Sequence, residues 1–140
     1  MLGGGNPIGG SNPSGTGERL NYIGDFAYAY SGRHAASTTL TTRMKFTTGD
    51  SLFVGELTGM GAVYVDSGDL ASGYITGWEV FFNGESIAGL KVDSAQEDQP
   101  HEYVIPLIIP ANTLVEIKTV SNGADADRKT STMLTGRVYY

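Results

Sequence analysis

The chain has 140 residues, a length that fits one domain with a hydrophobic core of its own. It contains no cysteine, which excludes disulfides, thiolate metal sites and a cysteine nucleophile. Nine Lys and Arg against fifteen Asp and Glu give a net charge of -6, so we expect no general attraction to nucleic acid or to an anionic membrane.

Residues 1–19 form an arm rich in Gly, Asn and Pro, and the remaining residues, 20–140, form the domain. Proline removes amide donors and glycine adds backbone entropy, so such a segment does not fold alone. It is either a disordered tail or an arm held by a neighbouring subunit through strand addition. The residues expected to make that contact are Leu2, Gly3, Gly4, Gly5, Asn6, Pro7, Ile8, Gly9 and Gly10. No charged segment followed by an apolar one opens the chain, so we expect no signal peptide.

The domain has the alternation of β-strands and no sustained helical period. Phe26, Tyr28 and Tyr30, for example, fall on one face of a strand. Turn residues and polar loops, including 121–129, separate about eight predicted strands: 26–30, 38–47, 52–58 continuing at 60–65, 74–82, 85–92, 103–109, 113–120 and 131–140. This number and spacing predict an all-β, antiparallel β-sandwich that is jelly-roll-like.

Asn83-Gly84 is the strongest turn signal, because both positions of a type I′ turn need positive φ. A two-residue turn there places Val80 opposite Ile87 and Trp78 over Gly89. Pro106 cannot donate to a ladder, so its strand should lie at a sheet edge or contain a bulge. The residues predicted to be buried, either in the core or at a contact between subunits, are Phe46, Phe53, Trp78, Val80, Ile87 and Leu107.

No pattern in the sequence points to catalysis. His34 and His101 each lie beside a turn and away from a second histidine, and no nucleophile elbow, P-loop or dinucleotide motif occurs. The pairs Asp66 with Asp69 and Asp125 with Asp127 are either calcium ligands or solvated loop charges, and neither pair has EF-hand spacing. We therefore predict no enzymatic activity, no cofactor and no metal-binding residues.

Tyrosine supplies most of the aromatic residues and gives amphipathic contact area at low entropic cost. We expect an interface between subunits to include Tyr22, Tyr28, Tyr30, Tyr139 and Tyr140. Trp78 shares a strand face with Val80, which favours a place in the core over a role in stacking against a sugar.

Several short strings resemble small structural proteins of tailed phages and other icosahedral viruses, namely capsid decoration or cement proteins and single jelly-roll capsid components. The strings are GGGNPIGGSNP in the arm, Leu20-Asn-Tyr-Ile-Gly24, Tyr28-Ala-Tyr-Ser-Gly32, Ile109-Pro-Ala-Asn-Thr113 and Leu134-Thr-Gly-Arg-Val-Tyr139. The resemblance implies a location in the virion, a symmetric homo-oligomer such as a trimer, and other capsid proteins as partners.

The arm contains no basic residue before Arg19, although phosphate contacts need cations. Binding to the genome is therefore not expected, and a place on the outer surface or between shell proteins fits better. Two alternatives stay open: a glycan-binding module of a fibre or secreted protein, and the principal shell protein of a small single-jelly-roll virus.

Overall fold

A computed structural model describes residues 20–64, 75–93 and 102–140. These residues form nine strands: β1 (Asn21–Ile23), β2 (Phe26–Ala36), β3 (Thr41–Thr47), β4 (Leu52–Tyr64), β5 (Ile75–Phe82), β6 (Glu85–Asp93), β7 (Glu102–Ile109), β8 (Leu114–Ser121) and β9 (Asp125–Tyr139). The described part of the chain contains no helix that is long and apolar enough to cross a membrane. The prediction of an all-β domain is confirmed.

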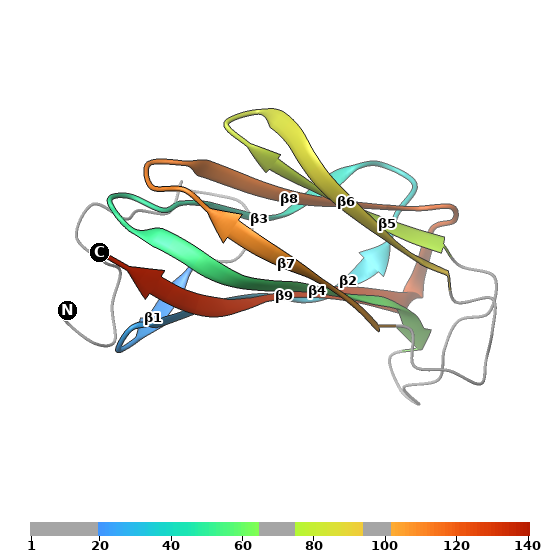
Figure 1. The fold of residues 1–140 in the computed structure, drawn as a ribbon. Coiled ribbons are helices and arrows are strands. Elements are labelled where there is room, and N and C mark those ends of the chain that lie inside the picture. Colours follow the sequence, from blue (N-terminus) through green and yellow to red (C-terminus); the bar gives the residue numbers. More distant parts are fainter. Residues whose placement is uncertain (1–19, 65–74, 94–101) are drawn as a thin grey trace.

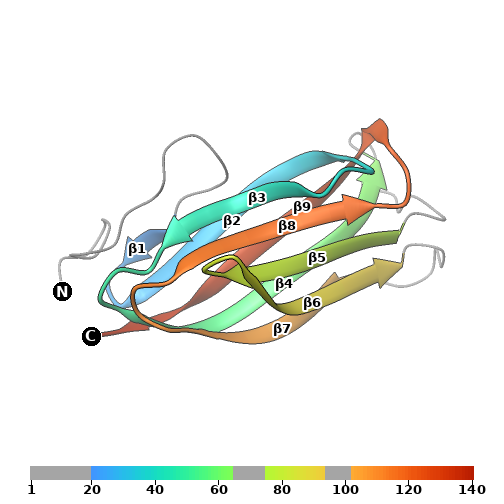
Figure 2. The same cartoon turned by 90° about the horizontal axis from the view of Figure 1, so that it is seen from above.

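Two antiparallel sheets stack face to face (Figure 1). The large sheet has the strand order β1-β2-β9-β4-β7, and the small sheet, seen in front in Figure 2, has the order β3-β8-β5-β6. The eight longer strands pair from the outside of the sequence inward: β2 with β9, β3 with β8, β4 with β7, and β5 with β6. A long antiparallel hairpin rolled into two sheets has this pairing, which makes the domain a jelly roll with β1 as a short addition.

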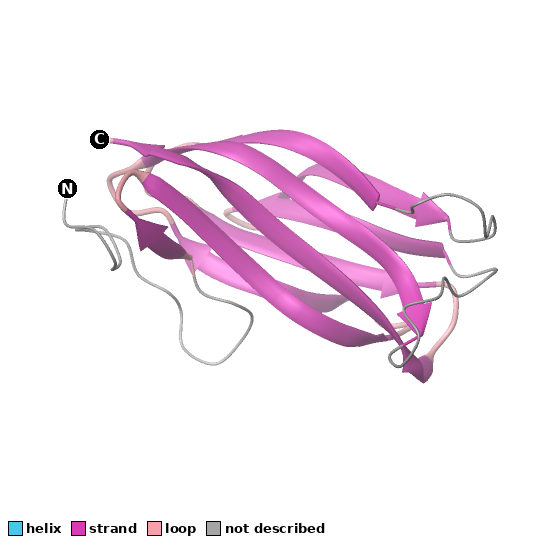
Figure 3. Cartoon of the chain, turned by 90° about the horizontal axis from the view of Figure 1, so that it is seen from below, coloured by secondary structure: helices cyan, strands magenta, loops and turns pink. Residues whose placement is uncertain are grey.

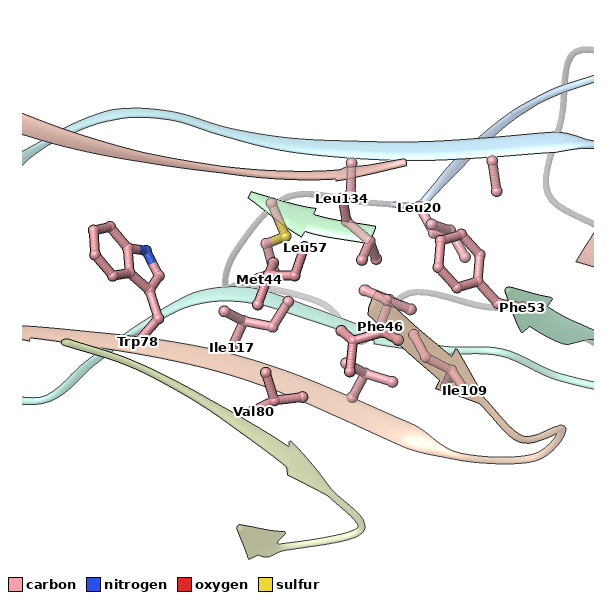
Figure 4. Packing of buried hydrophobic residues seen from close by; sticks show 14 of the residues in the cluster. Leu20, Met44, Phe46, Phe53, Leu57, Trp78, Val80, Ile109, Ile117 and Leu134 are labelled. Carbon is pink, nitrogen blue, oxygen red and sulfur yellow. The ribbon is translucent and has the colours of Figure 1, made fainter. Parts of the chain in front are cut away.

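The core lies between the sheets and extends along the sandwich from Trp78 to Phe53 (Figure 4). Five of the six residues predicted to be buried are buried; the exception, Ile87, is 46 % exposed. Each large buried side chain contributes about 1.5–3 kcal/mol relative to its exposed state. Two bulky rings from the two sheets, Phe46 and Phe53, are fully buried, as the strand alternation predicts.

The predicted hairpin at Asn83-Gly84 is confirmed, because φ is positive at both residues (51° and 88°) and β5 pairs with β6. Its predicted register is wrong beyond the first two pairs. Phe81 faces Ser86, but Val80 faces Ala88, because a bulge at Ile87 adds one residue to β6. The bulge leaves Ile87 outside the core.

The same shift changes the partner of the indole. Trp78 lies opposite Leu90 on β6, and Gly89 lies opposite Glu79. The glycine beneath the indole is Gly59 of β4 in the other sheet, where an added Cβ would lie 2.9 Å from Cδ2 of Trp78. Trp78 therefore covers a glycine across the sandwich and not the one on its neighbouring strand.

The predicted polar loop over residues 121–129 is shorter than expected, because β9 begins at Asp125. Lys129 pairs with Ala35 of β2 on one side and with Val63 of β4 on the other. Backbone hydrogen bonds to two neighbouring strands hold this polar segment extended, although its side chains give no apolar alternation. The predicted strand segments on either side of Gly59 are likewise one continuous strand, β4.

The position of Pro106 is as predicted, because among the described strands β7 lies at the edge of its sheet and pairs with β4 alone. Leu40, within the predicted strand 38–47, is exposed although Met44 and Phe46 are buried. A register break between Thr42 and Met44 separates it from the buried part of β3.

Candidate assembly surface

The outer face of the large sheet is turned to the viewer in Figure 3. It carries large exposed apolar side chains where a solvated sheet would carry polar ones. The strand registers align one residue from each of the five strands into a row across this face. The row consists of Ile23, Phe26, Arg137, Val54 and Ile108. Ile23 is 65 % exposed, Phe26 61 % and Ile108 64 %, so three of its members have most of their surface in solvent.

Two further rows continue the outer face along the strands. The second contains Tyr28, Thr135, Glu56 and Pro106, and the third contains Tyr30, Met133, Thr58 and Val104. The ring centroids of Tyr28 and Tyr30 are 5.4 Å apart. An open groove of about 740 Å³ follows β1, β2, β9 and β4, and its lining side chains include Ile23, Phe26, Tyr28, Tyr30, Val54, Glu56, Thr135 and Arg137. The three rows thus form one continuous surface, which we call the row face.

The structure places three of the predicted interface tyrosines on or beside the row face. Tyr28 is half-buried and Tyr30 is 49 % exposed, both on β2, and Tyr139 lies opposite Leu52 on the same side of the sheet. Tyr140 follows directly and is exposed. The side chain of Tyr22 and the predicted arm contacts from Leu2 to Gly10 lie outside the described residues.

Apolar members of the row face were not singled out from the sequence. Ile23, Val54 and Ile108 occupy outward positions of β1, β4 and β7. Val54 and Ile108 stand beside the apolar Phe53 and Ile109, so no alternation of apolar and polar residues marks their outward side, and no strand was predicted at Ile23. Only the order of strands in the sheet shows that these residues lie in one line with Phe26 and Arg137.

Three charged side chains lie on or beside this apolar surface: Arg137 and Glu56 belong to its rows, and Asp25 lies next to Arg137. Nη2 of Arg137 is 4.0 Å from Oδ2 of Asp25, and its guanidinium lies 5.3 Å from the centroid of the Tyr139 ring. Because both side chains of the ion pair are half-exposed, the pair adds little stability. Glu56 is exposed and forms no ion pair with any described residue.

The outer face of the small sheet is different in kind. Alternation with the buried Ile117 and Val80 directs Glu116, Lys118 and Glu79 outward. Nζ of Lys118 lies 4.0 Å from Oε2 of Glu116 and 4.7 Å from the centroid of the Phe81 ring. This charged surface is suited to water, whereas the row face is suited to a partner.

The four outermost strands of the described sheets each carry a feature that discourages strand addition. β1 has three residues, and β7 contains Pro106. The registers of β3 and β6 are broken, next to Arg43 and at Ile87. Short strands, prolines and bulges are the devices by which sheet edges avoid pairing with other chains. Contact through a face is therefore favoured over contact through an edge.

No catalytic arrangement is formed by the described residues. Nε2 of His34 donates a hydrogen bond to the backbone oxygen of Ser31. Asp125 accepts a bond from the Asp127 amide at 2.9 Å and lies 3.5 Å from Nε of Arg128, and nowhere in the described ranges do three metal-ligating residues gather. His101 and the pair Asp66 with Asp69 lie outside those ranges.

No protein-family model matches the chain, and no curated protein matches its sequence. Among solved structures, it is similar to the infectious bursal disease virus VP2 subviral particle, with a TM-score of 0.43 and 12 % identity over 91 % of this chain and 38 % of that one. It is also similar to the structure of the infectious bursal disease virus Gx strain, with a TM-score of 0.27 and 14 % identity over 90 % and 31 % of the two chains. The chain thus spans less than two fifths of either, and because both TM-scores are below 0.5, we infer nothing about its function from them.

Proposed function

We propose that the chain is a structural subunit of a virus shell that reinforces or decorates the capsid through non-covalent contacts. The observation that carries this proposal is the row face, in which one row of exposed side chains, four apolar and one arginine, crosses all five strands of the large sheet of a jelly roll. The jelly roll is a fold of viral capsid domains, and of lectins.

Burial of the row face gives the free energy of attachment. Apolar surface removed from water contributes roughly 25 cal/mol per Å², and contiguous exposed apolar patches mark interaction sites. The charged outer face of the small sheet then remains in solvent. In a shell, symmetry repeats each contact many times, so individually weak contacts hold the subunit firmly.

The charge of the chain supports a position away from the genome. A net charge of -6 opposes binding to phosphate backbones. The subunit is then expected on the outer surface of the shell or between shell proteins.

Virus particles purified from the source of this sequence provide the test. Quantitative mass spectrometry should find the chain at a fixed copy number per particle. The variant Phe26→Ser with Ile108→Ser should be lost from particles, while Phe81→Ser on the charged sheet should be retained, since it leaves the row face intact. Absence of the chain from purified particles would contradict the proposal.

A glycan-binding module is the second candidate, and one observation favours it: Phe26, Tyr28 and Tyr30 line an open groove together with the Glu56 carboxylate. Aromatic rings beside a polar group suit sugar stacking. Titration with oligosaccharides separates the two functions, because a glycan module should bind one class of sugar and lose that binding in Tyr30→Ala. Expression of the chain without any other capsid protein distinguishes a principal shell protein, because such a protein should then form closed particles by itself.

A further inference from the structure

We infer that the row face binds the row face of a second copy of this chain, with each Arg137 against Glu56 of the partner subunit. This inference rests on the proposed function and names one partner for its contact surface. The positions of Arg137 and Glu56 within the rows determine how two copies can meet.

Arg137 and Glu56 are diagonal neighbours. Val54 lies opposite Arg137, and Glu56 is two residues further along β4, opposite Thr135. With strands about 4.8 Å apart and a rise of about 3.4 Å per residue, the two Cα atoms are about 8 Å apart in the plane of the sheet. The rows therefore carry one positive and one negative side chain at neighbouring points, and Asp25 lies beside the positive one.

A two-fold contact between two such faces has its axis in the plane of the interface. If the axis runs midway between Arg137 and Glu56 and perpendicular to the line joining them, each of these residues is placed over the other residue of the partner subunit. With the same sheet spacing, the axis passes close to Tyr28 at one side and to Ile108 at the other. A residue on the axis contacts the same residue of the partner subunit. Tyr28 and Ile108 are both suited to such a contact, because one is aromatic and the other is aliphatic.

The charges explain why a second copy fits this face better than another acidic partner. Two copies that each carry a net charge of -6 repel one another. Arg137 and Glu56 are opposite in charge, so an isologous contact places them as two ion pairs between the subunits, and the half-exposed pair of Arg137 with Asp25 does not prevent this. Glu56, which pairs with no described residue within its own chain, gains a guanidinium partner in this arrangement.

Sedimentation of the full-length chain and two charge-reversed variants tests the contact. Arg137→Glu alone places two carboxylates together wherever position 137 of one subunit meets position 56 of the other. Glu56→Arg alone places two guanidinium groups together at the same points. The dissociation constant of the dimer should be at least tenfold higher for each single variant than for the unmodified chain. A mixture of the two variants should associate again, because in the mixed dimer every pair is opposite in charge.

The double variant Glu56→Arg/Arg137→Glu should also dimerise, within about threefold of the unmodified chain. Lys118→Glu on the small sheet is the matched control and should leave the dissociation constant unchanged. Circular dichroism melting of each variant verifies that a loss of association is not a loss of folding, since Arg137 also pairs with Asp25.

Three results would overturn the inference: an unmodified chain that stays monomeric, single variants that associate normally, or a mixture that fails to associate. If residues 1–19 cover the row face instead, the unmodified chain should be monomeric, and deletion of these residues should cause it to associate. The mixture of the two full-length single variants should then show no specific pairing. The two proposals can fail separately. If the chain is incorporated into particles but the mixed variants fail to associate, the proposed shell function stands and only this contact is rejected.

Discussion

Nε1 of Trp78 donates a hydrogen bond of 2.6 Å to Oγ1 of Thr132, which joins β5 of the small sheet to β9 of the large sheet through the interior. Both side chains are buried. An indole N–H enclosed in a core needs an acceptor, and the hydroxyl of Thr132 supplies one. This bond therefore joins the two sheets directly within the core.

Thr132→Val should therefore destabilise the domain by about 1–3 kcal/mol, because valine keeps the shape of the side chain but leaves the buried N–H without a partner. Thr135→Val, three residues on and exposed on the row face, should change the stability by less than about 0.5 kcal/mol. Urea denaturation measures both. Equal stabilities for the two variants would show that the indole bond contributes nothing.

Gly59→Ala should destabilise the domain by about 1–3 kcal/mol through overpacking, because the new methyl group would lie 2.9 Å from the indole. Gly77→Ala is the same chemical change at a site where the nearest atom is 3.9 Å from the new Cβ, so it should be neutral or slightly stabilising. Trp78 is the single tryptophan, so its fluorescence reports the strain directly. An unshifted spectrum in Gly59→Ala would contradict the packing described.

Gly84→Val tests the hairpin. The backbone at Gly84 has a φ of 88°, and a Cβ there would contact nothing within 4 Å, so any cost comes from the backbone alone. Valine should lower the free energy of unfolding by about 1–2 kcal/mol, whereas Gly84→Asn should cost less, because asparagine tolerates positive φ. Thermal unfolding compares them, and identical melting temperatures for both would count against the turn geometry.

Local signals in the sequence predicted local structure well. The Asn83-Gly84 turn follows from two adjacent residues, and the shared outward face of Phe26, Tyr28 and Tyr30 follows from a period of two. The edge position of Pro106 follows from its missing amide hydrogen.

Features that depend on distant partners were not predictable in this way. The bulge at Ile87 arises because Leu90 and Val92 turn toward the core, and a turn sequence carries no information about that. Gly59 meets Trp78 only after the sheets have stacked. Lys129 is in a strand because two neighbouring strands flank it, although its own surroundings in the sequence are polar.

Arg43 falls within the predicted strand 38–47, where nothing in the sequence indicates that it links the two sheets. Its Nε donates to Oγ1 of Thr119 at 2.9 Å, and its Nη2 donates to the backbone oxygen of Ala35 at 3.3 Å. Burial lowers the pKa of Arg43 from its usual value, and a guanidinium stays protonated at neutral pH. Arg43→Lys cannot reproduce both bonds and should cost about 1–2 kcal/mol, while Lys45→Arg should be neutral. Guanidinium chloride denaturation measures the difference, and a neutral Arg43→Lys would reject this link.

Deletion of residues 2–17 tests the predicted arm, which lies outside the described residues. Leu20, the first described residue, is 2 % exposed and is part of the core. The deletion ends before Leu20, so the core of the domain keeps all its residues. Ordering each arm residue costs about 1–2 kcal/mol, which a segment with few apolar side chains does not offset without a partner. The truncated domain should melt normally but attach to particles more weakly. Undiminished attachment would reject a role for the arm.

The pairing of the first long strand with the last also has a consequence for biosynthesis. Thr132 and Ser31 are joined by a hydrogen bond of 3.0 Å although 101 positions separate them, and β9 lies between β2 and β4. A nascent chain that lacks β9 has no centre for the large sheet, and such long-range pairing folds on the scale of milliseconds to seconds. The row face is therefore built only after translation has passed Tyr139. An incomplete chain, whose premature association would be harmful, has no finished surface with which to enter an assembly.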